Sequence, residues 1–238
     1  MKSKFKKICK FSIIFTLFIL ILSTAYSLFI IYSADKISKQ IIHDYFESDK
    51  VKITVNDLSE RQKTILLKVQ DPNFYNHKGV DFSTPGNGLT TLTQSITKFL
   101  YFDKFKPGFR KIKQSLIARF VLNKYATKDQ QITIFLNVIW FDKNINGFYD
   151  ASKYFYDKKI SELSEDEFIS LVAMVIQPKT FNIKTKPEAN KNRVERIKLL
   201  VSGKYRPKSL MDLYYGGNTY RQNQNKFLNY LNKIIWGY

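Results

Sequence analysis

Basic side chains gather between residues 98 and 113, where they could bind phosphate oxygens. Lys98, Arg110, Lys111 and Lys113 lie in this stretch, with Lys106 just upstream. Arginine and lysine suit phosphate oxygens because they offer charged N–H donors. Taken alone, the same side chains are equally typical of a solvated helix face.

The start of a helix nearby offers a second way to hold an anion. Thr91-Leu92-Thr93-Gln94 is a capping-box pattern, in which Thr91 precedes the helix and Gln94 completes the cap. Backbone N–H groups at such a terminus can bind phosphate. Thr91 and Gln94 could equally serve only as caps.

The composition limits the other kinds of site. Cys9 is the single cysteine, which rules out an intramolecular disulfide framework. The chain has only two histidines besides, which argues against a structural zinc site. With 238 residues the chain can form one domain with a sizeable core. Its net charge of +19 favours a phosphate or anionic membrane partner, although a lysine-rich solvated surface explains the charge as well.

The first 34 residues predict an uncleaved membrane anchor. Residues 1–10 carry five lysines and no acid, and residues 11–34 carry no charge. That uncharged helix would be about 36 Å long, enough for a bilayer core of about 30 Å. The lysines should stay in the cytoplasm and the rest of the chain should lie outside, where a nucleic-acid partner is not expected.

The chain beyond the anchor predicts a mainly α-helical domain. Capping-box patterns at Ser59, Thr91, Thr127 and Ser164 begin helices, and apolar residues recur at helical spacing over 111–125, 168–176, 190–201 and 223–236. The best candidate strand is 51–55. We expect a cytoplasmic segment at 1–10, an anchor at 11–34, a membrane-proximal linker at 35–57, a domain at 58–205 and a C-terminal extension at 206–238.

Five segments in order carry a more specific pattern. They begin with Gln70-Asp71-Pro72-Asn73-Phe74-Tyr75-Asn76-His77-Lys78-Gly79 and Gly88-Leu89-Thr90-Thr91-Leu92-Thr93-Gln94-Ser95-Ile96-Thr97-Lys98. Arg110-Lys111-Ile112-Lys113-Gln114, Phe135-Leu136-Asn137 before an aromatic turn, and 163–182 follow. The set resembles the peptidoglycan glycosyltransferase domain, glycosyltransferase family 51, which is lysozyme-like and helical. With no transpeptidase domain behind it, the layout is similar to that of the monofunctional enzymes.

The resemblance implies a protein of the bacterial cytoplasmic membrane that polymerises lipid II into glycan strands and releases undecaprenyl pyrophosphate. A carboxylate would remove the proton of the acceptor hydroxyl, and cations or a divalent metal, Mg²⁺ or Mn²⁺, would hold the pyrophosphate. Lipid II, the nascent glycan strand, the membrane and other cell-wall synthesis proteins are the partners that it implies. Its substrate-binding positions are Lys98, Arg110, Lys111, Lys113, Thr91, Thr93, Gln94, His77 and Asn137.

This sequence departs from the family at the catalytic positions. Gln70 and Gln114 stand where the family has glutamates, and an amide accepts no proton near neutral pH. Asp71 and Asp81 are the carboxylates that could replace them as the base. The link from Asp81 to Gly88 is shorter than the mobile segment usual in the family, and Thr133 stands where glutamate is common.

Two functions therefore stay open from the sequence. The first is a divergent glycosyltransferase with an altered base. The second is a degenerate module that binds lipid II or glycan and regulates an active cell-wall synthase. Glycan cleavage ranks last because it also needs an acidic proton donor. For His77, Asn137 and Glu167 a structural role is the main alternative.

Overall fold

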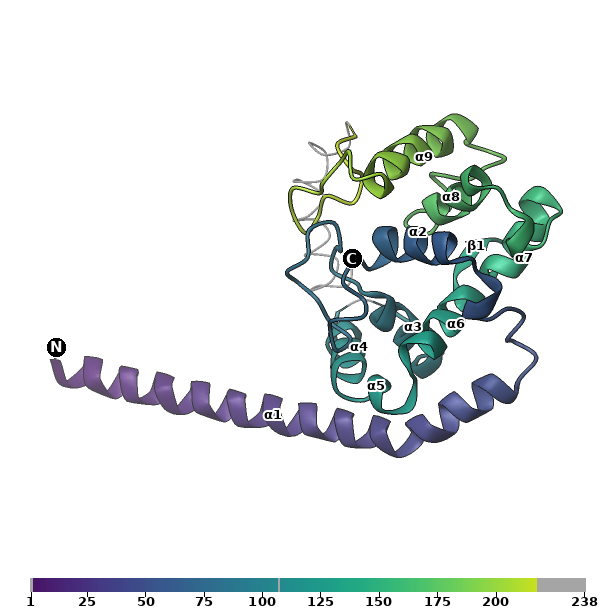
Figure 1. Ribbon diagram of the computed structural model, residues 1–238. Helices are drawn as coiled ribbons and strands as arrows, with labels where there is room; N and C mark the ends of the chain where they lie inside the picture. The colour runs from purple at the N-terminus through teal and green to yellow at the C-terminus, as the bar shows by residue number, and fades with distance from the viewer. Residues whose placement is uncertain (1, 107, 218–238) are drawn as a thin grey trace.

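A long helix, α1 (Lys2–Glu47), begins the chain and extends far beyond the rest of it (Figure 1). This arrangement is seen in a computed structural model, which describes residues 2–106 and 108–217. The segment Phe5–Glu47 is long and apolar enough to cross a membrane. Its large apolar side chains from Phe11 to Leu22 are exposed to the surroundings.

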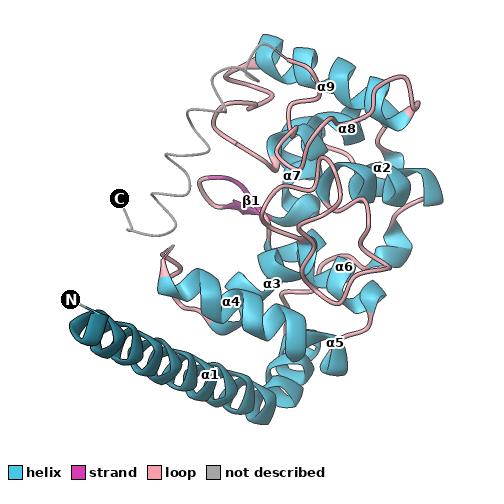
Figure 2. Cartoon of the chain, turned by 90° about the vertical axis from the view of Figure 1, so that its left-hand side faces the viewer, coloured by secondary structure: helices cyan, strands magenta, loops and turns pink. Residues whose placement is uncertain are grey.

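The second half of α1 packs against the domain beside helix α4 (Phe109–Phe120) (Figure 2). Ile30 and Ala34 form a small buried cluster with Ile117 and Val121. Residues 35–47, expected as part of a linker, are thus a continuation of the same helix.

The four predicted capping boxes each begin a helix. In all four, the capping side chain accepts a hydrogen bond from the backbone N–H three residues on, and the side chain of that residue accepts one from the backbone N–H of the capping residue. The helices are α2 (Glu60–Gln70), α3 (Leu92–Tyr101), α6 (Lys128–Val138) and α8 (Glu165–Met174). The last of these starts three residues earlier than the apolar pattern predicts, because Ser164 fixes its N-terminus.

The single helix predicted over 111–125 is wrong. The structure divides this stretch into α4 and α5 (Leu122–Tyr125). At the division Val121 is the C-cap of α4, with φ of −119° and ψ of −56°, and its side chain is buried in the cluster with α1. Helical spacing continues through the break, so periodicity alone does not detect it.

The strand predicted at 51–55 is also wrong. Its backbone N–H groups bond to side chains of α6 instead of to a second strand. Asn137 Oδ1 accepts from Lys52 N at 2.9 Å and from Ile53 N at 3.2 Å, and Thr133 Oγ1 accepts from Val55 N at 3.1 Å. The segment is extended and passes into a short 3₁₀ helix, η1 (Val55–Asp57).

Several elements complete the domain. The aromatic turn after α6 is a hairpin of β1 (Trp140–Asp142) and β2 (Ile145–Asn146), followed by α7 (Gly147–Tyr156). Gly147 begins α7 at φ 78°, where a Cβ would lie 2.8 Å from Asn137 O, so this position requires glycine. The 3₁₀ helix η2 (Ile160–Glu162) and helix α9 (Pro187–Val201) follow. The helix predicted over 223–236 lies outside the described residues.

Helix α8 forms the centre of the core. It contacts α2, α7 and α9 (Figure 1), and its apolar residues from Phe168 to Met174 are fully buried. Helix α6 packs against α3 and α7, also with fully buried apolar residues. This core fixes the C-terminus of α2 and the whole of α3, the two elements that carry the first two motifs.

Candidate functional site

Gln70 is the last residue of α2 and is half-buried. Its Nε2 lies 3.5 Å from Val172 O, a long contact that holds the side chain weakly. In the family that the motifs resemble, this position carries the first glutamate; here it carries a neutral amide at the C-terminal end of α2. Such a group can donate and accept hydrogen bonds, but it cannot take a proton from a sugar hydroxyl.

Asp71, the first candidate base, is completely buried, and it caps the end of α2 and the start of α3. Its carboxylate accepts a hydrogen bond from Leu92 N at 2.9 Å and faces His77 Nε2 at 2.9 and 3.0 Å. Gly79 N donates to His77 Nδ1 at 3.0 Å, so in the neutral ring the proton is on Nε2 and points at Asp71. The pair ties the end of α2 to the start of α3.

Asp81, the second candidate base, is saturated by donors within its own loop. Its carboxylate accepts from Ser83 N and Ser83 Oγ at 2.7 Å, from Asn73 Nδ2 at 3.0 Å, and from Thr84. Burial raises the pKa of Asp81, but the hydrogen bonds from Thr84, Ser83 and Asn73 outweigh it and hold the pKa far below its ordinary value. A carboxylate so well stabilised is a weak base.

At the start of α3, two backbone donors and two hydroxyl groups already have partners within the fold. Leu92 N bonds to Asp71, and Gln94 N bonds to Thr91 Oγ1 at 3.1 Å. Thr91 Oγ1 donates to Gly79 O at 2.7 Å, and Thr93 Oγ1 donates to Gln131 Oε1 at 2.8 Å. The expected phosphate contacts of Thr91, Thr93 and Gln94 are thus occupied by the fold.

Gln114 lies on α4 directly behind α3 and is 1% exposed. Its Nε2 donates to Gln94 O, while its buried Oε1 has no hydrogen-bond partner among the described residues. Hydrogen bonds thus run from Asp71 through the start of α3 to Gln114. The structure brings these predicted residues together, but with no free carboxylate among them.

Lys98 lies on α3 and Lys111 lies on α4, two helices that pack against each other. Lys111 Nζ donates to Thr90 Oγ1 at 2.9 Å. Burial, together with the charge of Lys98, lowers the pKa of Lys111 to about 8, and burial also lowers the pKa of Lys98. No carboxylate of the described chain forms an ion pair with either lysine.

The remaining predicted binding residues point elsewhere. Lys113 Nζ lies 5.5 Å from the centre of the Phe102 ring, and Arg110 donates to the Lys104 carbonyl at the surface. The Asn137 amide already has partners within the fold: Oδ1 accepts from Lys52 N and Ile53 N, and Nδ2 donates to Ile53 O and Thr133 O. Asn137 therefore acts structurally in this conformation.

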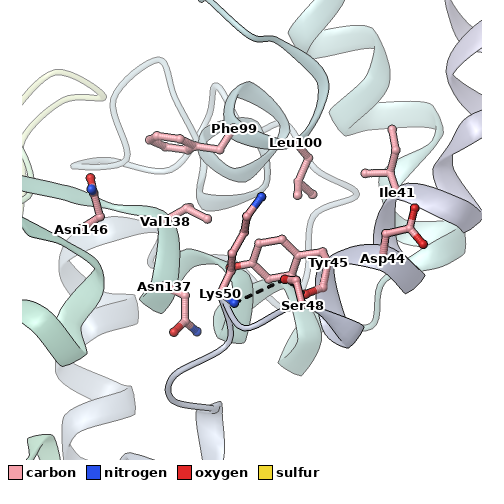
Figure 3. A pocket seen from close by; sticks show the side chains of 10 residues that line it. All are labelled: Ile41, Asp44, Tyr45, Ser48, Lys50, Phe99, Leu100, Asn137, Val138 and Asn146. Carbon is pink, nitrogen blue, oxygen red and sulfur yellow. Dashed lines mark hydrogen bonds between the residues drawn. The ribbon is translucent and has the colours of Figure 1, made fainter. Parts of the chain in front are cut away.

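A cavity of about 540 Å³ lies between the end of α1, the end of α3 and the end of α6. Tyr45, Phe99 and Leu100 form apolar walls, and the Lys50 ammonium projects between them (Figure 3). Phe99 also lies against Lys98, whose Nζ is 4.4 Å from the ring centre. The sequence does not mark Lys50, and it marks Thr90 only as a member of the second motif, because their contacts join distant segments.

The described residues contain no group of three His, Cys, Asp or Glu side chains able to hold a metal ion. Asp71 and Asp81, the two candidate bases, have their oxygens filled by N–H and O–H donors. The protein's own side chains in this part of the chain therefore do not fit a resident divalent metal.

Comparison with known proteins identifies related sequences. The family model described as transglycosylase matches residues 37–201. Penicillin-binding protein 1F of Bacillus subtilis is 26% identical over 165 residues, which cover 64% of this chain and 23% of that protein. Penicillin-binding protein 1B of Buchnera aphidicola is 30% identical over 168 residues, 63% of this chain and 22% of that protein. The chain thus spans about a quarter of the length of these relatives.

Proposed function

Because the chain belongs to the transglycosylase family of peptidoglycan glycosyltransferase domains, we propose that it binds lipid II at the outer face of a bacterial cytoplasmic membrane. Lys98 and Lys111 receive the pyrophosphate. The observation that carries this proposal is the pair itself: burial lowers the pKa of both lysines, the charge of Lys98 adds to the effect on Lys111, and neither lysine has an ion-paired carboxylate in the described chain. Such a pair destabilises the free protein and is relieved when an anion binds.

The placement of α4 supports delivery of the substrate from the membrane. Ile30 and Ala34, within the predicted anchor, pack against α4. On the outer side of the same helix Phe109, Ile112 and Phe120 are 80%, 51% and 49% exposed. Lipid at the edge of the bilayer would cover this stripe and leave the lysine pair near the headgroups.

The orientation has a direct test, because Cys9 is the single cysteine. In intact cells a membrane-impermeant maleimide should leave Cys9 unlabelled and should label a Ser161→Cys variant, whose new thiol lies on the exposed η2 turn. Labelling of Cys9 before lysis would overturn the proposed orientation.

The geometry supports binding of lipid II better than its turnover. The two positions for acidic catalysts carry Gln70 and Gln114, and Asp71 and Asp81 are committed to hydrogen bonds within the fold. General base catalysis typically contributes about 10²–10⁴-fold. We therefore assign the protein the role of a module that holds lipid II or nascent glycan and thereby regulates an active cell-wall synthase.

Polymerisation is the second candidate, favoured by the intact helical scaffold and by the membership of the family. In this reaction the 4-hydroxyl of one lipid II sugar would attack the anomeric carbon of another chain, with release of undecaprenyl pyrophosphate. A divalent cation would have to arrive with the pyrophosphate, since the described side chains offer it no cluster of ligands.

The deciding experiment uses the full-length protein in nanodiscs with labelled lipid II, with and without Mg²⁺ or Mn²⁺. We expect binding without glycan chains, and loss of binding in a Lys98→Met/Lys111→Met variant. Glycan chains made by the native protein would establish polymerisation instead. Equal binding by the native protein and the double-methionine variant would refute the site. If a Gln70→Glu/Gln114→Glu variant makes glycan chains, the scaffold is competent for polymerisation and lacks only the two carboxylates.

A further inference from the structure

The loop at residues 81–90 joins the two motifs that build the site. At its start the Asp81 carboxylate accepts a hydrogen bond from Ser83 N, which stabilises the turn. Asn87 Nδ2 donates to Asp81 O at 3.0 Å. At its end Thr90 Oγ1 accepts the hydrogen bond from Lys111 Nζ. The conformation of this loop therefore determines where the partner of Lys111 lies.

Residues 205–217, here called the C-terminal strap, hold the middle of this loop. Gly86 N donates to Ser209 O at 2.9 Å, and Gly88 N donates to Leu210 O at 2.8 Å. The approach is so close that a Cβ on Gly86 would lie 2.8 Å from Pro207 Cγ. Two backbone hydrogen bonds and this contact attach the loop to a segment more than a hundred residues later.

The strap is itself fixed to the core. Buried Arg193 donates to Leu213 O at 3.0 Å, and its guanidinium lies 5.5 Å from the ring centres of Tyr214 and Tyr215. Tyr215 is 3% exposed, and its hydroxyl reaches Val69 O at 3.3 Å, one residue before Gln70. The strap thus contacts the end of α2 and the loop together.

We propose that the C-terminal strap is a positioning element for the pyrophosphate site, because it fixes loop 81–90 and thereby the Thr90 partner of Lys111. This inference rests on the proposed function, since it concerns the same lysine. A loop released from the strap would admit water around Lys111, and the ammonium would lose its prearranged contact. Binding of pyrophosphate would then require the loop to be ordered at the moment of binding.

A matched pair of glycine substitutions tests the strap. Gly86→Ala places a Cβ against the Pro207 ring at φ +82°, so the strap or the loop must move. Gly203→Ala imposes the same kind of backbone strain at φ +77°, but no atom lies within 4 Å of the new Cβ. A Gly86→Ala/Pro207→Gly variant removes the clashing ring and should restore the contact.

Three readouts follow each variant of the full-length protein. Hydrogen exchange at residues 86 and 88 should accelerate at least tenfold in Gly86→Ala, because those amides lose their acceptors. The midpoint of pH-dependent labelling of Lys111, expected near pH 8 in the native protein, should move upward. Affinity for inorganic pyrophosphate should fall about tenfold. Gly203→Ala should change none of these, and the double variant should revert all three.

The positioning role of the strap is refuted if Gly86→Ala accelerates exchange but changes neither the pH midpoint of Lys111 labelling nor the affinity for pyrophosphate. It is equally refuted if Gly203→Ala moves Lys111 as far as Gly86→Ala does. Failure of the proposed function is a separate result: Lys111→Met would then bind pyrophosphate like the native protein. In that case the exchange rates and the labelling midpoint still decide whether the strap positions Lys111.

Discussion

Replacing Lys111 with methionine should stabilise the free protein and abolish its binding of pyrophosphate. The pKa of Lys111 falls from the ordinary value of 10.5 to about 8, mainly through burial. A fall of that size corresponds to about 3 kcal/mol by which the fold disfavours the ammonium. Methionine fills similar space without charge. Loss of the hydrogen bond to Thr90 offsets about 1 kcal/mol of this stabilisation. We therefore expect the free energy of unfolding to rise by about 2 kcal/mol.

The pH dependence gives the gain a signature. Below pH 8 Lys111 is charged in both the folded and the unfolded chain, and the whole penalty is present. Between pH 8 and 10.5 the unfolded chain binds more protons than the folded chain, so native stability rises with pH relative to the variant. The advantage of Lys111→Met should therefore be largest below pH 8 and fall as the pH rises; above pH 10.5 only the lost hydrogen bond to Thr90 remains, and the native protein should be more stable by about 1 kcal/mol.

Thermal unfolding and calorimetric titration measure the two effects. A gain of about 2 kcal/mol corresponds to about 4–8 °C for a domain of this size. Lys153→Met, at an exposed position of helix α7, serves as the control and should change neither melting temperature nor pyrophosphate affinity. A Lys111→Met variant that melts lower than the native protein, or that binds pyrophosphate unchanged, would refute the reasoning. The first result would mean that Lys111 is structural.

Three other perturbations test neighbouring parts of the site. Pyrophosphate affinity should fall as the pH rises through about 8, because Lys111 then loses its proton, and in calorimetric titrations Lys111→Arg should keep its affinity to higher pH. Gln114→Glu should weaken pyrophosphate binding about tenfold, since it puts a carboxylate one helical turn from Lys111; unchanged affinity would contradict this. Asp71→Asn should lower the melting temperature by about 4–8 °C, because a charged acceptor of two hydrogen bonds is lost; an unchanged melting temperature with loss of glycan synthesis would identify Asp71 as a base.

Local signals in the sequence predicted much of the fold. The four capping boxes depend on residues three positions apart, and all four form as predicted. The break at Val121 and the extended segment at 51–55 depend instead on partners 78 to 91 residues away, as the contacts of Val55 with Thr133 and of Val121 with Ile30 illustrate. Propensity and periodicity contain no information about such partners.

The candidate site divides in the same way. The motifs predicted which residues gather near α3, and the structure brings Asp71, Thr91, Gln94 and Gln114 together. What each side chain does there depends on which donors are already taken. The commitment of Asp71 and Asp81 to the fold could not be predicted, because the donors come from loop geometry that leaves no periodic trace in the sequence.

The two glutamines have opposite effects on binding and on turnover. A glutamine has nearly the shape of a glutamate but no charge, and Gln114 lies one helical turn from Lys111 on α4, so a glutamate there would place a negative charge near this lysine. A carboxylate there would compensate the lysine and repel pyrophosphate, whereas a neutral amide leaves the positive charge for the ligand. The same replacement removes the groups that would accept the proton of the acceptor sugar. A site so composed would hold an anionic ligand more strongly and transform it less readily, which is the behaviour that the proposed role in retaining lipid II requires.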